Sequence, residues 1–264
     1  MDRTFIHEGR SVRWGKIGEG PPLVLIHGTP FSSQVWRRIA PLLARQWTVY
    51  YFDLLGYGAS EKGGDVSLGV QNGLLAALLG YWKLERPEVL CHDFGGATAL
   101  RAYYLDGLRY QRLVIIDAVA LAPWGSPFVA HVRHHQSVFT GLPAYAHDAL
   151  LAAYLKGAAY GDLSAAALDA YMGPWQGEEG QAAFYAQIAQ MDQRFTDEVE
   201  PFYGALDCPV TVLWGEEDAW IPIEKGEDLA RKLSDRPLIR VPGAGHLMQD
   251  DAPEAIIAAM LGGG

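Results

Sequence analysis

Short runs of apolar residues, several of them rich in Val and Ile, recur along the chain and alternate with longer stretches that have apolar positions at three- and four-residue spacing. The runs predict buried strands, and the stretches between them predict helices that cover a sheet. The predicted strands are residues 22–26, 48–53, 87–91, 113–117, 209–215 and 237–243. Helices are predicted within residues 35–46, 68–82 and 95–108. This alternation favours an α/β fold with a mainly parallel sheet covered on both faces.

Residues 120–200 interrupt the alternation, because they contain almost no strand signal and have the composition of helices rich in Ala, Leu, Tyr and Gln. Since this stretch lies between two predicted strands, we interpret it as an inserted helical cap. The turn-forming segments PWGSP and GPWQGEEG mark its corners. The length of 264 residues suits one domain with such an elaboration. We therefore predict a core of residues 1–119 and 201–264 and a cap of residues 120–200.

Charge and composition narrow the classes of partner. The net charge is −10 and no cluster of Lys and Arg occurs, which argues against a nucleic-acid partner or an anionic membrane surface. No stretch approaches the roughly 20 apolar residues that span a bilayer. Two cysteines, Cys91 and Cys208, are too few for a disulfide framework, and we expect both to be reduced. These features predict a cytoplasmic protein that acts on a small molecule, and they leave its oligomeric state open.

The chemistry is suggested first by residues 87–104, where a predicted strand, PEVLC, runs through His92 into Asp93-Phe94-Gly95-Gly96 and then into a helix. A strand, a sharp turn with small residues and a helix are the context of a nucleophile elbow. Asp93 occupies the position of the nucleophile. An Asp at this point is also a good helix N-cap, so the motif needs support from other segments.

Three further segments give that support. His27-Gly28-Thr29-Pro30 follows the strand LVLI, where the backbone N–H groups of Thr29 and Phe94 could form an oxyanion hole. Asp218 follows the strand PVTVLWG, and His246 lies in a Gly-rich loop before the last predicted helix. The order nucleophile, acid and histidine is the one that this arrangement requires. Asp117 also ends a predicted strand and stays an alternative to Asp218 as the acid.

The whole chain resembles the α/β-hydrolase superfamily. The segments HGTPFSSQVW, FDLLGYGAS, HDFGG, GEEDAWIP and GAGHLMQDDAPE resemble its haloalkane dehalogenase and epoxide hydrolase branch. This resemblance implies an α/β-hydrolase fold with an inserted cap and a carboxylate nucleophile.

A carboxylate nucleophile narrows the reaction. Attack by Asp93 on a saturated carbon leaves an ester that activated water can hydrolyse, whereas a serine would leave an inert ether. We therefore expect a hydrolase that acts on a small apolar epoxide or haloalkane. Asp93 forms an alkyl-enzyme ester, and His246, oriented by Asp218, activates the water. This chemistry needs no metal or organic cofactor, and the histidines of the cap lack strong metal-ligand spacing.

The leaving group is less well defined by the sequence. Haloalkane dehalogenases usually carry a Trp after the nucleophile and an Asn in the oxyanion loop, where this chain has Phe94 and Thr29. Fluoroacetate dehalogenases commonly carry arginines beside the nucleophile and one turn later, where this chain has Phe94 and Ala97-Thr98. Epoxide opening, with cap tyrosines as proton donors, is thus slightly favoured. The residues predicted to contact the substrate are Trp124, Trp175, Trp220, Tyr145 and Tyr185, and Tyr154, Tyr160 and Tyr171 are further cap tyrosines.

Three alternatives stay open at this level. An esterase or lactonase could carry Asp at the elbow. A ligand-binding receptor could retain the fold without catalysis, although the apparently complete triad argues against it. A base reaction through His246 on an acidic substrate would make Asp93 dispensable.

Overall fold

The computed structural model describes residues 1–262, and its centre is an eight-stranded sheet with the order β1-β2-β4-β3-β5-β6-β7-β8. The strands from β3 onward pair in parallel, whereas β1 and β2 pair antiparallel with their neighbours. The strands are β1 (Arg3–His7), β2 (Arg10–Ile17), β3 (Pro22–Ile26), β4 (Thr48–Phe52), β5 (Glu88–His92), β6 (Arg112–Ile116), β7 (Val210–Gly215) and β8 (Ile239–Val241). The predicted mainly parallel sheet is confirmed.

The six predicted strands correspond to β3 through β8. Five of them, β3 to β7, are buried almost throughout, as their continuous apolar runs require when helices cover both faces. β8 is shorter than predicted and is partly exposed, because it forms an edge of the sheet.

The hairpin formed by β1 and β2 was not predicted. Its two-residue turn consists of Glu8 and Gly9, both with positive φ, which is the turn geometry that matches the twist of a hairpin. The strands alternate in burial instead of forming an apolar run, so a search for apolar runs overlooked them. The Glu-Gly pair between two alternating segments is the signal that could have revealed them.

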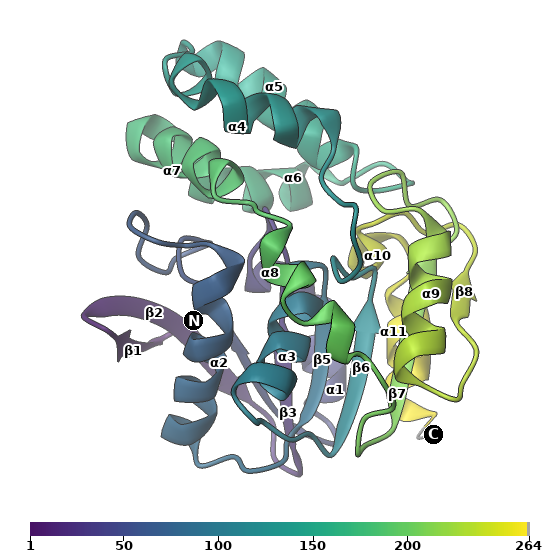
Figure 1. The fold of residues 1–264 in the computed structure, drawn as a ribbon. Coiled ribbons are helices and arrows are strands. Elements are labelled where there is room, and N and C mark those ends of the chain that lie inside the picture. Colours follow the sequence, from purple (N-terminus) through teal and green to yellow (C-terminus); the bar gives the residue numbers. More distant parts are fainter. Residues whose placement is uncertain (263–264) are drawn as a thin grey trace.

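Helices cover both faces of the sheet. α2 and α3 lie side by side in front of it, and α1 lies behind it (Figure 1). Outside the cap the helical elements are η1 (Ser33–Trp36), α1 (Ala40–Leu43), α2 (Leu68–Trp82), α3 (Phe94–Leu105), α9 (Ile223–Leu233), α10 (Met248–Asp251) and α11 (Pro253–Leu261). α2 has the predicted bounds. The helix predicted within residues 35–46 is instead divided into η1 and α1, because Pro41, in the first turn of α1, has no N–H with which to continue the hydrogen bonds of the preceding turn.

Between β6 and β7 the chain forms only helices and loops, and most of them lie above the carboxyl ends of the parallel strands (Figure 1). They are α4 (Pro127–Thr140), α5 (Ala144–Lys156), α6 (Ala165–Met172), η2 (Gly173–Trp175), α7 (Gly177–Ala189), α8 (Arg194–Asp197) and η3 (Glu200–Phe202). We call the helices α4 to α7 the cap. The last two residues of the predicted core segment, 263–264, lie outside the described residues. No helix within residues 1–262 combines the length and the apolar character that crossing a membrane requires.

Candidate active site

Asp93 lies at the sharp junction between β5 and α3. Its φ of 52° and ψ of −118° belong to a region that side-chain-bearing residues rarely adopt, so the surrounding structure must impose this conformation. Glycines make the tight packing possible. A Cβ atom on Gly28 would collide with the Asp93 side chain, and one on Gly95 would collide with the carbonyl oxygen of Ile26. The strained turn projects the buried Asp93 carboxylate from the end of the central strand.

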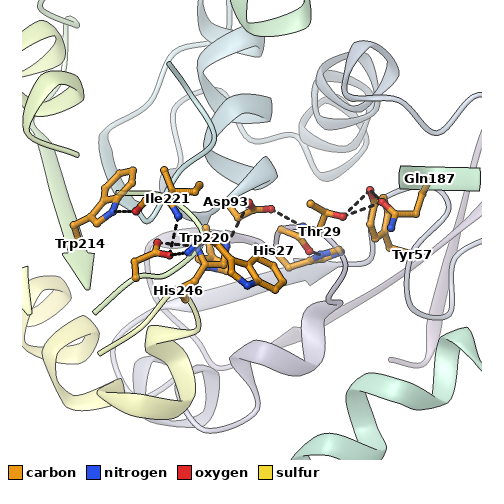
Figure 2. Close-up of polar contacts among 12 residues, drawn as sticks. His27, Thr29, Tyr57, Asp93, Gln187, Trp214, Trp220, Ile221 and His246 are labelled. Atoms are coloured by element: carbon orange, nitrogen blue, oxygen red, sulfur yellow. Dashed lines mark hydrogen bonds and ion pairs between the residues drawn. The ribbon is translucent and has the colours of Figure 1, made fainter. Parts of the chain in front are cut away.

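The loop after β3 brings a backbone donor to this carboxylate. The Thr29 N–H donates to Asp93 Oδ1 over 2.6 Å (Figure 2). Phe94 is the first residue of α3, where a backbone N–H has no acceptor within its own helix. Of the two amides that the sequence suggested for an oxyanion hole, that of Thr29 thus bonds to Asp93 from the loop after β3, and that of Phe94 follows Asp93 directly in the chain.

His246 lies on the other side of the carboxylate. Its Nε2 atom is 3.4 Å from Asp93 Oδ2, and its Nδ1 atom is 2.9 Å from Asp218 Oδ2. Burial alone would lower the pKa of His246. The negative charges of Asp218 and Asp93 and their hydrogen bonds outweigh burial and raise the pKa well above its ordinary value. The arrangement favours a protonated imidazole as long as both carboxylates are ionised.

The acid beside His246 is Asp218, and its orientation is set by the backbone. Asp218 Oδ1 accepts hydrogen bonds from the N–H groups of Trp220, over 2.7 Å, and Ile221, over 2.9 Å. Its other oxygen is thereby free to face His246. Both oxygens of the Asp218 carboxylate thus have a partner, as in a triad in which the acid fixes the histidine tautomer.

Asp117, the alternative acid, is placed differently. It is fully buried and accepts a hydrogen bond from the Gly215 N–H over 2.9 Å. Burial and the nearby negative charge of Asp218 raise the pKa of Asp117 well above its ordinary value. A raised pKa disfavours the charged form that would balance an imidazolium, and among the described residues Asp117 makes no hydrogen bond or ion pair with His246. The geometry therefore favours Asp218 over Asp117 as the partner of His246.

His92, the residue before Asp93, supports the histidine loop. Burial, followed by the positive charge of His246, lowers the pKa of His92 to about 3, so its ring is neutral. Its Nε2 atom is 2.8 Å from the backbone carbonyl oxygen of His246, which can only accept, so the N–H of His92 donates. β5 thus positions both Asp93 and the loop that carries His246.

Above Asp93 lies a pocket between the core loops and the cap. Its room for water-sized molecules is about 50 Å³, enough for only a few waters at roughly 10 to 15 Å³ each. The pocket is lined by Thr29, Asp93, Phe94, Val119, Trp124, Gly125, Ser126, Val129, Tyr154, Met191, Trp220 and Ile221. The walls are mainly apolar and aromatic, and in this arrangement of the cap they leave space for a small molecule.

Of the five residues predicted to contact the substrate, the structure brings Trp124 and Trp220 to this pocket. Tyr145 is 79% exposed on α5 and does not line it. Trp175 is buried where its indole N–H donates to the Pro30 carbonyl over 2.7 Å. Tyr185 is buried inside the cap, with its hydroxyl 3.0 Å from His147 Nδ1. The structure does not bring these last three side chains to the pocket.

Tyr154 is the tyrosine that lines the pocket. The sequence analysis included it among five cap tyrosines, and no feature of the sequence distinguishes it from the others. Burial, followed by the negative charge of Asp93, raises the pKa of Tyr154 and keeps its hydroxyl protonated. That hydroxyl makes no hydrogen bond with any residue from 1 to 262 and is thus available to a bound molecule.

The sequence analysis also missed a polar contact that links the cap to the oxyanion loop. The Thr29 hydroxyl donates to Gln187 Oε1 over 2.9 Å, and the Tyr57 hydroxyl donates to the same oxygen over 3.0 Å (Figure 2). Gln187 belongs to α7 and is buried. A single glutamine in a helix carries no sequence signal for such a role. In the part of the chain that the structure describes, no group of three or more His, Cys, Asp and Glu side chains is arranged to hold a metal ion.

Comparison with known proteins identifies the family. Residues 23–259 match the model of the alpha/beta hydrolase family, and the chain belongs to that family. This confirms the predicted α/β-hydrolase fold. An alpha/beta hydrolase fold protein from Burkholderia ambifaria has a crystal structure that superimposes with a TM-score of 0.98 at 57% identity, over 99% of this chain and 97% of the other.

Two further relatives have named activities. The chain is 36% identical to a soluble epoxide hydrolase from Corynebacterium sp. (strain C12) over 146 residues, which are 52% of this chain and 50% of that protein. A haloalkane dehalogenase from Agrobacterium tumefaciens C58 superimposes with a TM-score of 0.81 over 98% of this chain and 94% of the other. Its identity of 19% supports the shared fold alone.

Proposed function

We propose that this protein is a hydrolase in which Asp93 forms an alkyl-enzyme ester with a small apolar electrophile, and that this electrophile is an epoxide. The observation that carries the proposal is the position of one carboxylate, Asp93, between the Thr29 amide at 2.6 Å and His246 at 3.4 Å. In this family the nucleophile occupies the elbow. A carboxylate there suits displacement at saturated carbon, since the resulting ester can be hydrolysed.

In the first step the two oxygens of Asp93 have different roles. Oδ1 is held by the Thr29 N–H, so Oδ2, which faces His246, attacks the carbon. A new bond forms between Oδ2 and the carbon, and the electron pair of the broken bond goes to the leaving atom. In an epoxide that atom is the ring oxygen, which stays attached through the second carbon and takes a proton.

In the second step water hydrolyses the ester. Nε2 of His246 takes a proton from water, whose oxygen attacks Cγ of Asp93, and negative charge develops on Oδ1. The amides of Thr29 and Phe94 stabilise this charge, and Asp218 stabilises the imidazolium. The intermediate then breaks its bond between Cγ and Oδ2, and His246 returns the proton to the departing alcohol oxygen. Asp93 is then a carboxylic acid, and its proton replaces the one that was given to the opened ring oxygen. The cycle thereby restores the Asp93 carboxylate and uses one water.

The pocket favours an epoxide over a halide as the leaving group. The Tyr154 hydroxyl is protonated and unpaired among the described residues, and it can donate a proton to the opening oxygen. A halide needs N–H donors, and of the two pocket tryptophans Trp124 already donates its indole N–H to the Thr196 hydroxyl over 2.8 Å, which leaves only the indole N–H of Trp220 among these two side chains. Phe94 has no side-chain N–H. The similarity to a soluble epoxide hydrolase over half of the chain agrees with this choice.

The test is intact-mass spectrometry of the His246→Gln variant after exposure to small epoxides, haloalkanes and esters. This variant should form the Asp93 ester and fail to hydrolyse it. An added mass equal to the whole epoxide indicates ring opening, and an added alkyl group without the halogen indicates dehalogenation. Peptide mapping should place the adduct on Asp93, and the double variant with Asp93→Ala should remain unmodified.

The same set of compounds distinguishes the proposed function from the alternative functions. If wild-type protein turns over a compound for which the variant forms no adduct, Asp93 is not the nucleophile, and an ester hydrolase or a base reaction through His246 replaces this proposal. If no compound is turned over and none reacts, the ligand-binding receptor becomes the better description.

A further inference from the structure

Three aromatic rings form a stack that begins in the cap and ends at the candidate triad. The Trp220 ring lies 5.0 Å from the His246 ring, with an angle of 28° between their planes. On the side of Trp220 toward the cap, the Tyr154 ring lies 4.7 Å away at 22°. The indole therefore contacts both the imidazole of the core and the phenol of α5, and the Phe31 ring lies 6.3 Å from it at 25° (Figure 2 labels Trp220 and His246).

The backbone places Trp220 rigidly. Its N–H donates to Asp218 Oδ1 over 2.7 Å, so the same residue orients the acid through its main chain and covers the histidine with its ring. Ile221, the next residue, donates to the same oxygen over 2.9 Å. These bonds fix the backbone from which the ring projects, and the contact with Tyr154 opposes rotation of the ring away from His246.

We propose that Trp220 is a positioning residue that stabilises the imidazolium form of His246 through its ring face. This inference rests on the proposed function of His246 as the base. An aromatic face carries partial negative charge and attracts a cation that lies above it, most strongly when tryptophan supplies the ring and water is excluded. His246 is fully buried. A neutral imidazole gains less from this contact than an imidazolium, so the ring favours the step in which His246 takes a proton from water.

The other groups that face His246 have separate effects. Asp218 and Asp93 favour its charged form, whereas the neutral His92 lies at 4.9 Å on another side of the ring and donates to the backbone oxygen of His246. Asp117 ends the neighbouring strand β6, and burial raises the pKa of its carboxyl group. All four remain in place when only the ring of Trp220 is changed, so its contribution can be measured by itself.

The decisive substitution is Trp220→Leu, which keeps an apolar neighbour beside His246 and removes the aromatic face. The pKa of His246, followed by NMR of its ring, should fall by about one unit in this variant. Trp220→Phe should show a smaller fall, because its ring face attracts cations less strongly. The resonance is assigned by its loss in His246→Gln. Trp124→Leu is the matched control, because Trp124 also lines the pocket but contacts Phe94 instead of the histidine.

Single-turnover kinetics give a second readout. In Trp220→Leu the hydrolysis of the Asp93 ester should slow by about tenfold, while formation of the ester changes less, so the ester accumulates. A merely structural role of Trp220 would slow both steps or lower the stability. If Trp220→Leu does not fold, wild-type protein made with fluorinated tryptophans retains the ring shape and weakens the charge of the ring face. The pKa of His246 should then fall as the number of fluorines rises.

An unchanged pKa of His246 in Trp220→Leu and across the fluorinated series would overturn the inference. That result is independent of the adduct experiment, because the ionisation of His246 is measured without substrate. A missing adduct on Asp93 together with a shifted pKa would instead refute the proposed function and leave the ring contact established.

Discussion

The floor and the roof of the pocket are held in place in different ways. The floor is formed by Asp93 and Thr29, and Asp218 and His246 lie next to it without lining the pocket. All four residues lie after the ends of strands, where backbone hydrogen bonds and close glycine contacts fix them. The roof includes Trp124, Val129 and Tyr154, which belong to the cap or to its entry loop. Their directions depend on how the cap helices pack. The floor can therefore be recognised from short motifs, whereas the roof cannot.

The strongest test of the floor compares its two candidate acids. Asp218→Asn should lower turnover by roughly 10³- to 10⁴-fold, because the imidazolium loses its charge partner and the wrong tautomer of His246 is favoured. Asp117→Asn should retain most of the turnover, since an amide oxygen can still accept from the Gly215 N–H. Steady-state kinetics on a substrate found in the adduct panel give the ratio. The reverse pattern would assign the triad acid to Asp117.

The strongest test of the roof concerns the proton donor. Tyr154→Phe keeps the ring stacked on Trp220 and removes the hydroxyl, so ester formation from an epoxide should slow by about 10²-fold. Ester formation from a haloalkane should change little, because a departing halide needs no proton. Tyr145→Phe is the control, since that side chain is 79% exposed. Equal losses in both variants, or in both substrate classes, would contradict a role of Tyr154 as the acid.

The pH dependence of ester hydrolysis tests the role of His246 as the base. Asp218 and Asp93 together raise the pKa of His246 in the free enzyme. Esterification removes the charge of Asp93, so the pKa of His246 should be lower in the alkyl-enzyme than in the free enzyme. Below this lower value, hydrolysis of the ester should accelerate about tenfold per pH unit as the imidazole becomes neutral. The pH dependence of single-turnover rates gives the pKa of His246 in the alkyl-enzyme, and NMR titration gives its pKa in the free enzyme. A kinetic pKa at or above that of the free enzyme would count against His246 as the base.

The smallest effect on turnover is expected from a substitution inside the cap, away from the pocket. In the Tyr185→Phe variant, His147 Nδ1 loses its partner and stays buried, while His147 Nε2 keeps its bond to the Trp175 carbonyl. The free energy of unfolding should fall by about 1 to 3 kcal/mol, as urea titration can measure. Turnover at a temperature where the variant is folded should hardly change. A marked loss of turnover without a loss of stability would return Tyr185 to the substrate pocket.

The amino-acid sequence by itself determined the parallel part of the sheet, since continuous apolar runs can be satisfied only as strands buried on both faces. It also determined the positions of Asp93, His246, Thr29 and Phe94, because each lies in a short local pattern at a strand end. The first hairpin was within reach of the same reasoning, through the Glu8-Gly9 turn between two alternating strands.

Only the tertiary structure decided the rest. Asp117 and Asp218 both follow strands, and what separates them is the path of each loop: Asp218 meets His246, and Asp117 is buried against Gly215. Tyr145 and Tyr154 are close in sequence, yet α5 exposes the first and directs the second to the pocket. Such choices depend on long-range packing between elements far apart in the chain, which no local pattern of residues contains.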